Sequence, residues 1–341
     1  MESNPPPPAS APRSSGLPRV AVLDANRTVA QRVGRVLRAA SGLSEVVVEA
    51  DPASLRGSLD DDPILLACDA SDIDIALDWT TRRYPNISVV AWSNGDMGPL
   101  LAAARQNPRL VSILGWPSFA SMPRPWELAM ATRRIIDTES VSPRLGELFA
   151  WGSTVARFRP RGSAERDAAV TEVGNLSERA GASPRIAQRV AEVAHEMLMN
   201  AMYDAPIDES GYPKYAHDRK QELVLEDHEV PTFRLATDGI NVALQVVDPF
   251  GRLRRHHVLD GIIRGRGAAT SEAPAIDTSN GGAGLGIYRI YSQSTVMITD
   301  VDPGAFTSVT AFFDLDVNPR EARTLPVSLH MFERATVRSG R

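Results

Sequence analysis

The sequence predicts an α/β protein of two units. The first is a doubly wound, five-stranded parallel sheet, and the second is a mixed sheet with helices on one face. Between residues 18 and 137, short apolar runs alternate with amphipathic stretches, which is typical of a parallel sheet covered by helices on both sides. After residue 152, amphipathic stretches precede several strand-like segments, which favours helices packed on one face of a mixed sheet.

In the first unit, each short apolar run indicates a buried strand and each stretch with helical periodicity indicates a helix. The third expected strand ends at Asp69 and the fourth ends at Ser93. In chain order, the expected strands are 20–23, 45–49, 64–68, 87–92 and 110–114, and the expected helices are 29–37, 53–59, 73–84, 100–106 and 126–137.

The second unit is expected to open with an edge strand over 155–160 and an amphipathic helix over 165–179. Ser183 and Pro184 then form a helix start, with serine at the N-cap and proline at the first helical position. That helix is expected to run to Ala205, because a proline follows. The strands expected after it are 223–225, 232–237, 242–247, 296–299 and 307–315.

Length and composition limit the class of protein. A chain of 341 residues fits two domains of about 100–200 residues each. The net charge of −5 gives no indication of a nucleic-acid-binding surface. The only cysteine, Cys68, is consistent with a reducing compartment. No apolar run approaches the roughly 20 residues that span a bilayer. We therefore expect a cytoplasmic protein without direct nucleic-acid or membrane binding. The expected parts of the chain are a disordered proline-rich tail (1–17), a first unit (18–137), a linker (138–152), a second unit (153–318) and a C-terminal tail (319–341).

Three segments of the second unit contain the polar groups of a nucleotide site. On the expected helix, Glu196 and Asn200 are four residues apart and therefore share a face. Asp248 ends an apolar strand, where its carboxylate can accept a hydrogen bond from an adenine amino group. Segment 281–286 reads Gly-Gly-Ala-Gly-Leu-Gly and leads into a helix, whose first amides can bind phosphate. An amide oxygen such as that of Asn200 is a ligand suited to Mg²⁺.

In this order the three segments resemble the N, G1 and G2 boxes of the GHKL ATPase superfamily, which includes histidine kinases, anti-sigma-factor serine kinases and gyrase B. The resemblance covers residues 150–318 and implies the Bergerat α/β sandwich, with ATP and Mg²⁺ as cofactors. It implies that Glu196 is the catalytic base, that Asn200 binds the metal and that Asp248 recognises adenine. The other positions that it assigns to nucleotide binding are Gly251, Gly282, Gly284, Leu285 and Gly286.

The second unit also departs from the family pattern. The usual G1 form is Asp-x-Gly-x-Gly, whereas this chain reads Asp-Pro-Phe-Gly-Arg over 248–252, with Phe250 and Arg252 at the two glycine positions. Tyr203 and Asp204 stand where a lysine or histidine usually follows the N-box asparagine and alanine. Taken singly, each segment also fits an ordinary turn, helix surface or strand end. Between G1 and G2 the family has a mobile lid, and the cations of this chain in that region are expected either to contact the triphosphate or to lie in a solvated loop. These cations are Arg252, Arg254, Arg255, His256, His257, Arg264 and Arg266.

The first unit resembles the receiver domain of response regulators over residues 18–137. Asp69 stands at the position of the phosphorylated aspartate, and Ser93 at that of the switch serine or threonine. However, no second acid follows Asp24, and Trp116 occupies the place of the lysine that stabilises the phosphoryl group. Two interpretations stay open. Either Asp69 is phosphorylated and switches the second unit, or the unit is a pseudo-receiver used for dimerisation or partner docking.

Together the resemblances imply an intracellular signal-transduction protein that binds ATP and Mg²⁺ and acts on a protein partner. The implied activity is that of a protein Ser/Thr kinase of anti-sigma-factor type, whose partner is a regulator or sigma-factor-like protein. Two alternatives remain: a non-enzymatic partner-binding switch with a degenerate ATPase domain, and a histidine kinase acting in trans. Formation of a homodimer, and the choice between ATP hydrolysis and phosphoryl transfer, are left open by the sequence.

Overall fold

The computed structural model describes residues 19–59, 62–117, 120–137, 144–149, 152–219, 221–270, 283–316 and 325–334. The strands in these ranges are β1 (Val20–Leu23), β2 (Val46–Glu49), β3 (Leu65–Asp69), β4 (Ser88–Ser93), β5 (Leu110–Gly115), β6 (Thr154–Phe158), β7 (Thr232–Thr237), β8 (Asn241–Asp248), β9 (Val296–Asp302), β10 (Phe306–Asp314) and β11 (Ser328–Glu333). The helices are α1 (Arg27–Ala40), α2 (Pro52–Ser58), α3 (Ile73–Arg82), α4 (Gly98–Gln106), α5 (Pro125–Ile136), α6 (Ser163–Arg179), α7 (Pro184–Met199), α8 (Arg255–Thr270) and α9 (Ala283–Gln293), with the 3₁₀ turns η1 (Ala70–Asp72) and η2 (Leu145–Leu148) and the π turn η3 (Asn200–Asp204).

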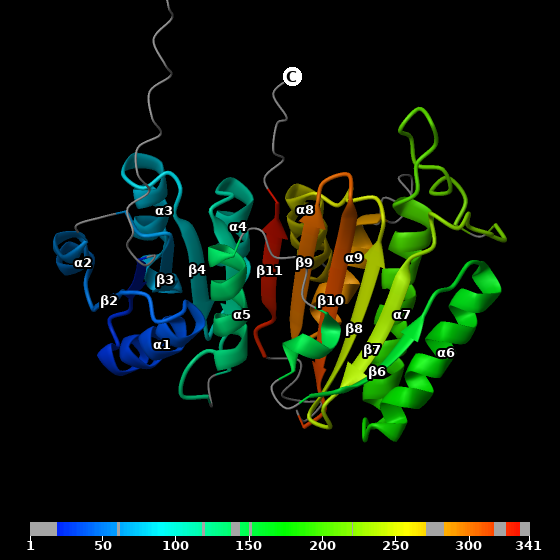
Figure 1. Cartoon of the computed structure of the whole chain (residues 1–341), viewed down its shortest axis with the longest axis horizontal. Helices are drawn as coiled ribbons and strands as arrows, with labels where there is room; N and C mark the ends of the chain where they lie inside the picture. The colour runs from blue at the N-terminus through cyan, green and yellow to red at the C-terminus, as the bar shows by residue number, and fades with distance from the viewer. Residues whose placement is uncertain are drawn as a thin grey trace, which may run out of the picture.

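One continuous sheet of eleven strands runs through the molecule, with helices against both of its faces (Figure 1). Its strand order is β2-β1-β3-β4-β5-β11-β9-β10-β8-β7-β6. The expected α/β class is therefore confirmed, but the two sheets expected from the sequence are joined into a single mixed sheet. None of the described helices combines the length and the apolar composition that crossing a membrane would require.

The first half of the sheet is parallel, because β1 pairs with β2 and β3, β3 with β4, and β4 with β5, each in parallel register. Successive side chains of β1 enter two different cores. Ala21 and Leu23 pack with the helices α2, α3 and α4, whereas Val20 and Val22 pack with α1 and α5. A strand covered on both faces is apolar at every position, which explains the uninterrupted apolar runs in the sequence.

Strand β11 joins the two halves of the sheet. It pairs antiparallel with β5, where Leu329 faces Ile113, and parallel with β9 along its whole length. Range 319–341, expected to be a tail, thus contains a central strand. The strand is only six residues long, and its polar Ser328 and His330 occupy fully buried positions, so the polar residues do not mark a solvent-exposed face.

Two other segments differ from the expectation. Residues 223–225 form no strand, and only an isolated bridge between Gly162 and Val224 is present there. The region expected to be a loop after the second motif instead contains helix α8, whose Val258, Leu259 and Ile262 are buried. The apolar stripe of α8 is short and lies among many cations, so charge obscures its helical periodicity in the sequence.

The two halves also contact each other on both faces of the sheet. On one face, Trp126 of α5 packs on Phe312 of β10 with their ring centroids 4.8 Å apart. On the other face, α4 packs against α8, and the guanidinium of Arg255 donates to the main-chain carbonyls of Ala104 at 3.1 Å and Leu110 at 2.5 Å. Burial lowers the pKa of Arg255 to about 10.

Candidate functional site

A cavity of about 360 Å³ lies in the second half of the molecule, between α7, η3, α8 and α9 and the strands β8 and β10. Most of its wall surface is apolar, and several polar side chains converge on it. The polar lining residues are Asn200, Asp204, Asp248, Arg252, His257, Asp260, Arg264 and Thr307. A cavity of this size, with apolar wall surface and convergent polar groups, is typical of sites for small organic ligands.

Asp248 is a buried carboxylate in the wall of the cavity, with 6% of its surface exposed. It ends β8, and the pairing of β8 with β10 places Thr307 directly opposite. The Asp248 carboxylate accepts a hydrogen bond from the amide of Phe250 at 3.0 Å and another from the Thr307 hydroxyl. Burial raises the pKa of Asp248 to about 6. The side chain is thus a desolvated acceptor that faces the cavity.

Thr307 was not identified from the sequence, although it is 3% exposed and lines the same cavity as Asp248. The two residues are 59 positions apart (307 − 248), and only the register of two antiparallel strands brings them together. No local pattern in the sequence marks such a pair.

Helices α7 and α9 meet at Gly286. A β-carbon on Gly286 would lie 2.9 Å from Glu196 Oε2 and 3.4 Å from Asn200 Oδ1. The missing side chain therefore lets α9 approach the face of α7 on which the two polar residues lie. Asn200 lines the cavity, whereas Glu196 lies beside it and forms an ion pair of 2.6 Å with Arg289 of α9.

The remaining glycine-motif residues lie in different places. Gly251 adopts a positive φ of 62°, and a β-carbon there would lie 2.1 Å from the carbonyl oxygen of Asp302. It therefore allows close packing against the β9–β10 turn and is not among the residues that line the cavity. Leu285 is 39% exposed on α9, and Gly284 lies in the first turn of that helix. Gly282 lies outside the described residues.

The C-terminal end of the π turn η3 is held by two arginines. Asp204 pairs with Arg219, and Arg252 donates to the carbonyls of Asp204 at 3.4 Å and Ala205 at 3.3 Å. Burial raises the pKa of Asp204 despite the opposing effect of Arg219. Arg252 is thus engaged with the main chain while it lines the cavity.

Of the cations expected between the second and third motifs, Arg252, His257 and Arg264 line the cavity. Burial together with the neighbouring His256 lowers the pKa of His257. By contrast, Arg255 and Arg266 contact the first half, since Arg266 pairs with Asp96 at 2.6 Å. Helix α8 therefore links the wall of the cavity to the first half of the molecule.

In the first half, Asp69 ends β3 as expected, and its carboxylate accepts a hydrogen bond from the Ser71 amide at 2.9 Å. Asp24 is 5% exposed and accepts from the indole of Trp92 at 3.2 Å. Burial raises the pKa of Asp24, and the nearby Asp69 carboxylate adds to this effect. The Trp116 indole donates to the carbonyl of Ala120 at 2.9 Å. Within the described part of the chain, no three His, Cys, Asp or Glu side chains are grouped to hold a metal ion.

No known family model and no curated protein sequence matches the chain. Two solved structures resemble parts of it weakly. The SiaB–SiaC complex from Pseudomonas aeruginosa aligns with a TM-score of 0.31 and 17% identity, over 46% of this chain and 88% of that chain. The response regulator DrrB, an OmpR/PhoB homolog from Thermotoga maritima, aligns with a TM-score of 0.29 and 13% identity, over 36% of this chain and 54% of that chain. Scores this low do not establish a shared fold.

Proposed function

We propose that the chain binds an adenine nucleotide together with Mg²⁺ in the cavity between α7, α8, α9 and β8, as part of a signal-transduction protein. The observation that supports this most is the environment of Asp248. Its carboxylate is desolvated and faces a cavity with aliphatic walls. A buried carboxylate that faces a cavity calls for a hydrogen-bond donor in the ligand, and the exocyclic amino group of adenine is such a donor.

The other polar groups fit the rest of the nucleotide. Asn200 lines the cavity, and its amide oxygen is a hard ligand suited to Mg²⁺. Helix α9 begins beside it, and the amides at a helix start favour phosphate oxygens. When bound, Mg²⁺ would neutralise phosphate charge. The residues present in this cavity therefore suit a nucleotide with its metal.

A protein Ser/Thr kinase of anti-sigma-factor type is the activity that would use this arrangement. In that reaction the hydroxyl oxygen of a partner serine or threonine bonds to the γ-phosphorus, the bond between the γ-phosphorus and the β–γ bridging oxygen breaks, and ADP leaves. The carboxylate of Glu196 would take the hydroxyl proton. The required partner is a protein with an accessible hydroxyl side chain.

The ion pair between Glu196 and Arg289 favours a second function, a partner-binding switch without phosphoryl transfer. A carboxylate held at 2.6 Å by a guanidinium is already engaged as an acceptor. Measured phosphoryl transfer to a co-purified protein, lost in Glu196→Gln, would support the kinase, whereas nucleotide-dependent partner binding that persists in Glu196→Gln would support the switch.

The binding proposal is tested by titrating the full chain with ATP and ADP, each with and without Mg²⁺. Asp248→Asn should weaken binding under all four conditions by about 1.5–3 kcal/mol, because the adenine amino group loses a charged acceptor. Asn200→Ala should remove only the affinity gained from Mg²⁺. Asn175→Ala, an exposed change on α6, serves as the matched control.

The wild-type titration decides the proposal by itself. Absence of ATP and ADP binding by a folded wild-type chain would refute it. Binding that is unchanged in Asp248→Asn would place the nucleotide elsewhere. Binding by the wild type that ignores Mg²⁺ would remove the role proposed for Asn200.

A further inference from the structure

Helix α7 does not end as an α-helix but as the π turn η3, in which the amide of Ala205 donates to the carbonyl of Asn200 at 3.0 Å. In an α-helix, four residues turn through slightly more than a full circle, whereas in a π turn they turn through less than one. The π turn therefore brings Asp204 back over the face of Glu196 and Asn200. Consistent with this, the Glu196 carboxylate acts to raise the pKa of Asp204, and both Asn200 and Asp204 line the cavity.

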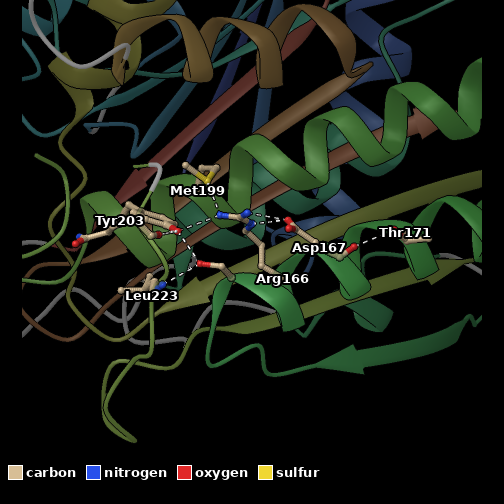
Figure 2. A network of polar contacts seen from close by, with 8 residues as sticks. Arg166, Asp167, Thr171, Met199, Tyr203 and Leu223 are labelled. Atoms are coloured by element: carbon tan, nitrogen blue, oxygen red, sulfur yellow. Dashed lines mark hydrogen bonds and ion pairs between the residues drawn. The ribbon is translucent and has the colours of Figure 1, made fainter. Parts of the chain in front are cut away.

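The residue between them, Tyr203, points away from the cavity into a polar network. It is 1% exposed, and its hydroxyl donates to the carbonyl of Gln221 at 3.2 Å. The same hydroxyl accepts from the guanidinium of Arg166 at 3.2 Å and lies 3.0 Å from the Ser163 hydroxyl. Figure 2 shows Arg166 reaching from α6 towards Tyr203, with Asp167 on the other side of the guanidinium.

The network is fully connected, which gives it rigidity. Ser163 accepts from the amide of Leu223 at 3.0 Å and so has its hydroxyl proton available for Tyr203. Arg166 also donates to the sulfur of Met199 at 3.1 Å, and its guanidinium lies 5.7 Å from the centre of the Tyr203 ring. Every partner of the Tyr203 hydroxyl thus comes from a different position on α6 or on the segment before β7. Buried polar networks with all members satisfied fix a single conformation.

We infer that Ser163, Arg166 and Tyr203, here called the Tyr203 network, are positioning residues that hold η3 in its π conformation and so keep Asn200 and Asp204 directed into the cavity. This inference rests on the proposed function, since it assigns the network to the metal-binding end of the nucleotide site. None of the three residues is among those that line the cavity. Their effect on binding would pass through Asn200.

The test compares Tyr203→Phe with Tyr215→Phe in the full chain. Tyr203→Phe removes one hydroxyl and keeps the ring, so the buried partners of that hydroxyl are left unsatisfied. Tyr215→Phe removes a hydroxyl that bonds Glu229 at 3.0 Å in the same half of the molecule and that is not part of the Tyr203 network. Two quantities are measured for each variant: the ratio of ADP affinities with and without Mg²⁺, and hydrogen exchange in the peptide that spans residues 199–206.

We expect Tyr203→Phe to reduce the Mg²⁺-dependent gain in ADP affinity at least about fivefold, which is the typical effect of losing one hydrogen bond. The ADP affinity without Mg²⁺ should stay within about twofold of the wild-type value. Exchange of the 199–206 peptide should speed up by about the same factor, and Tyr215→Phe should change neither quantity. A Ser163→Ala variant should reproduce the effect, and combining it with Tyr203→Phe should add little, because members of one network are not independent.

Two results would overturn the inference. One is a rate of hydrogen exchange in the 199–206 peptide of Tyr203→Phe that equals the wild-type rate. The other is an equal loss of ADP affinity with and without Mg²⁺, which indicates general destabilisation. If the wild-type chain binds no nucleotide, the proposed function fails, and the exchange measurement alone then decides whether the network holds η3.

Discussion

Replacing Asp248 by asparagine should make the protein more stable while it weakens nucleotide binding. Asparagine keeps an oxygen that can accept from the Phe250 amide and the Thr307 hydroxyl, but it carries no charge. The pKa of Asp248 is about 6 in the folded chain, against 3.8 for an ordinary aspartate, because burial disfavours the ionised form. At pH 7 the folded state therefore holds an ionised group that the unfolded state solvates better.

The size of the effect follows from the difference between the folded and unfolded pKa values. Because the folded pKa is raised, the folded state binds more protons than the unfolded state between pH 4 and 6. The protonated carboxyl thus stabilises the fold fully below about pH 4, and this contribution is lost as the pH rises through 6. Relative to a side chain that stays neutral, the raised pKa of Asp248 lowers the free energy of unfolding by about 3 kcal/mol at pH 7 and by about 1.6 kcal/mol at pH 5, where the folded state is largely protonated and the unfolded state is ionised.

Urea denaturation of the wild type and Asp248→Asn at pH 7 and pH 5 measures this cost. We expect the variant to be more stable by up to about 3 kcal/mol at pH 7, and the difference to fall by about half at pH 5. Asp316→Asn, a change at an exposed position, is the matched control and should alter stability little at either pH. Equal stability of wild type and Asp248→Asn at pH 7, or a difference that grows as the pH falls, would refute the account of Asp248 as a buried charge whose desolvation outweighs its favourable interactions.

Two further predictions concern single residues. Acetyl phosphate should not phosphorylate Asp69 appreciably, because Asp24 accepts a hydrogen bond from the Trp92 indole and Trp116 occupies the place of the expected lysine. Intact-mass spectrometry detects any adduct. A stoichiometric adduct on the wild type that is absent from Asp69→Asn would contradict the prediction. Gly251→Ala should lower the free energy of unfolding by at least about 2 kcal/mol, since the positive φ of Gly251 and its closeness to the Asp302 carbonyl leave no room for a β-carbon. Urea denaturation measures this loss, and Gly57→Ala, at a position with open space around it, is the control. Wild-type stability in Gly251→Ala would show that the turn can move.

Much of the fold could be predicted from local sequence. The five strands and five helices of the first half lie within about three residues of their expected ends, because strands buried on both faces are uniformly apolar and their helices have a clear stripe. The start of α7 was also predictable, since Ser183 caps the helix by accepting from the Ile186 amide. The same local patterns pointed to Asn200 and Asp248, which the fold brings to one cavity.

What only the tertiary structure decided concerns contacts between distant segments. Strand β11 pairs with β5 on one side and with β9 on the other, and nothing in its six residues identifies these two neighbours. Thr307 meets Asp248 through strand register, and Tyr203 meets Ser163 and Arg166 through the packing of α6 on α7. Periodicity reports whether a side chain faces a core or solvent, whereas the identity of its partner depends on how separate elements pack, and for that the sequence has no local signal.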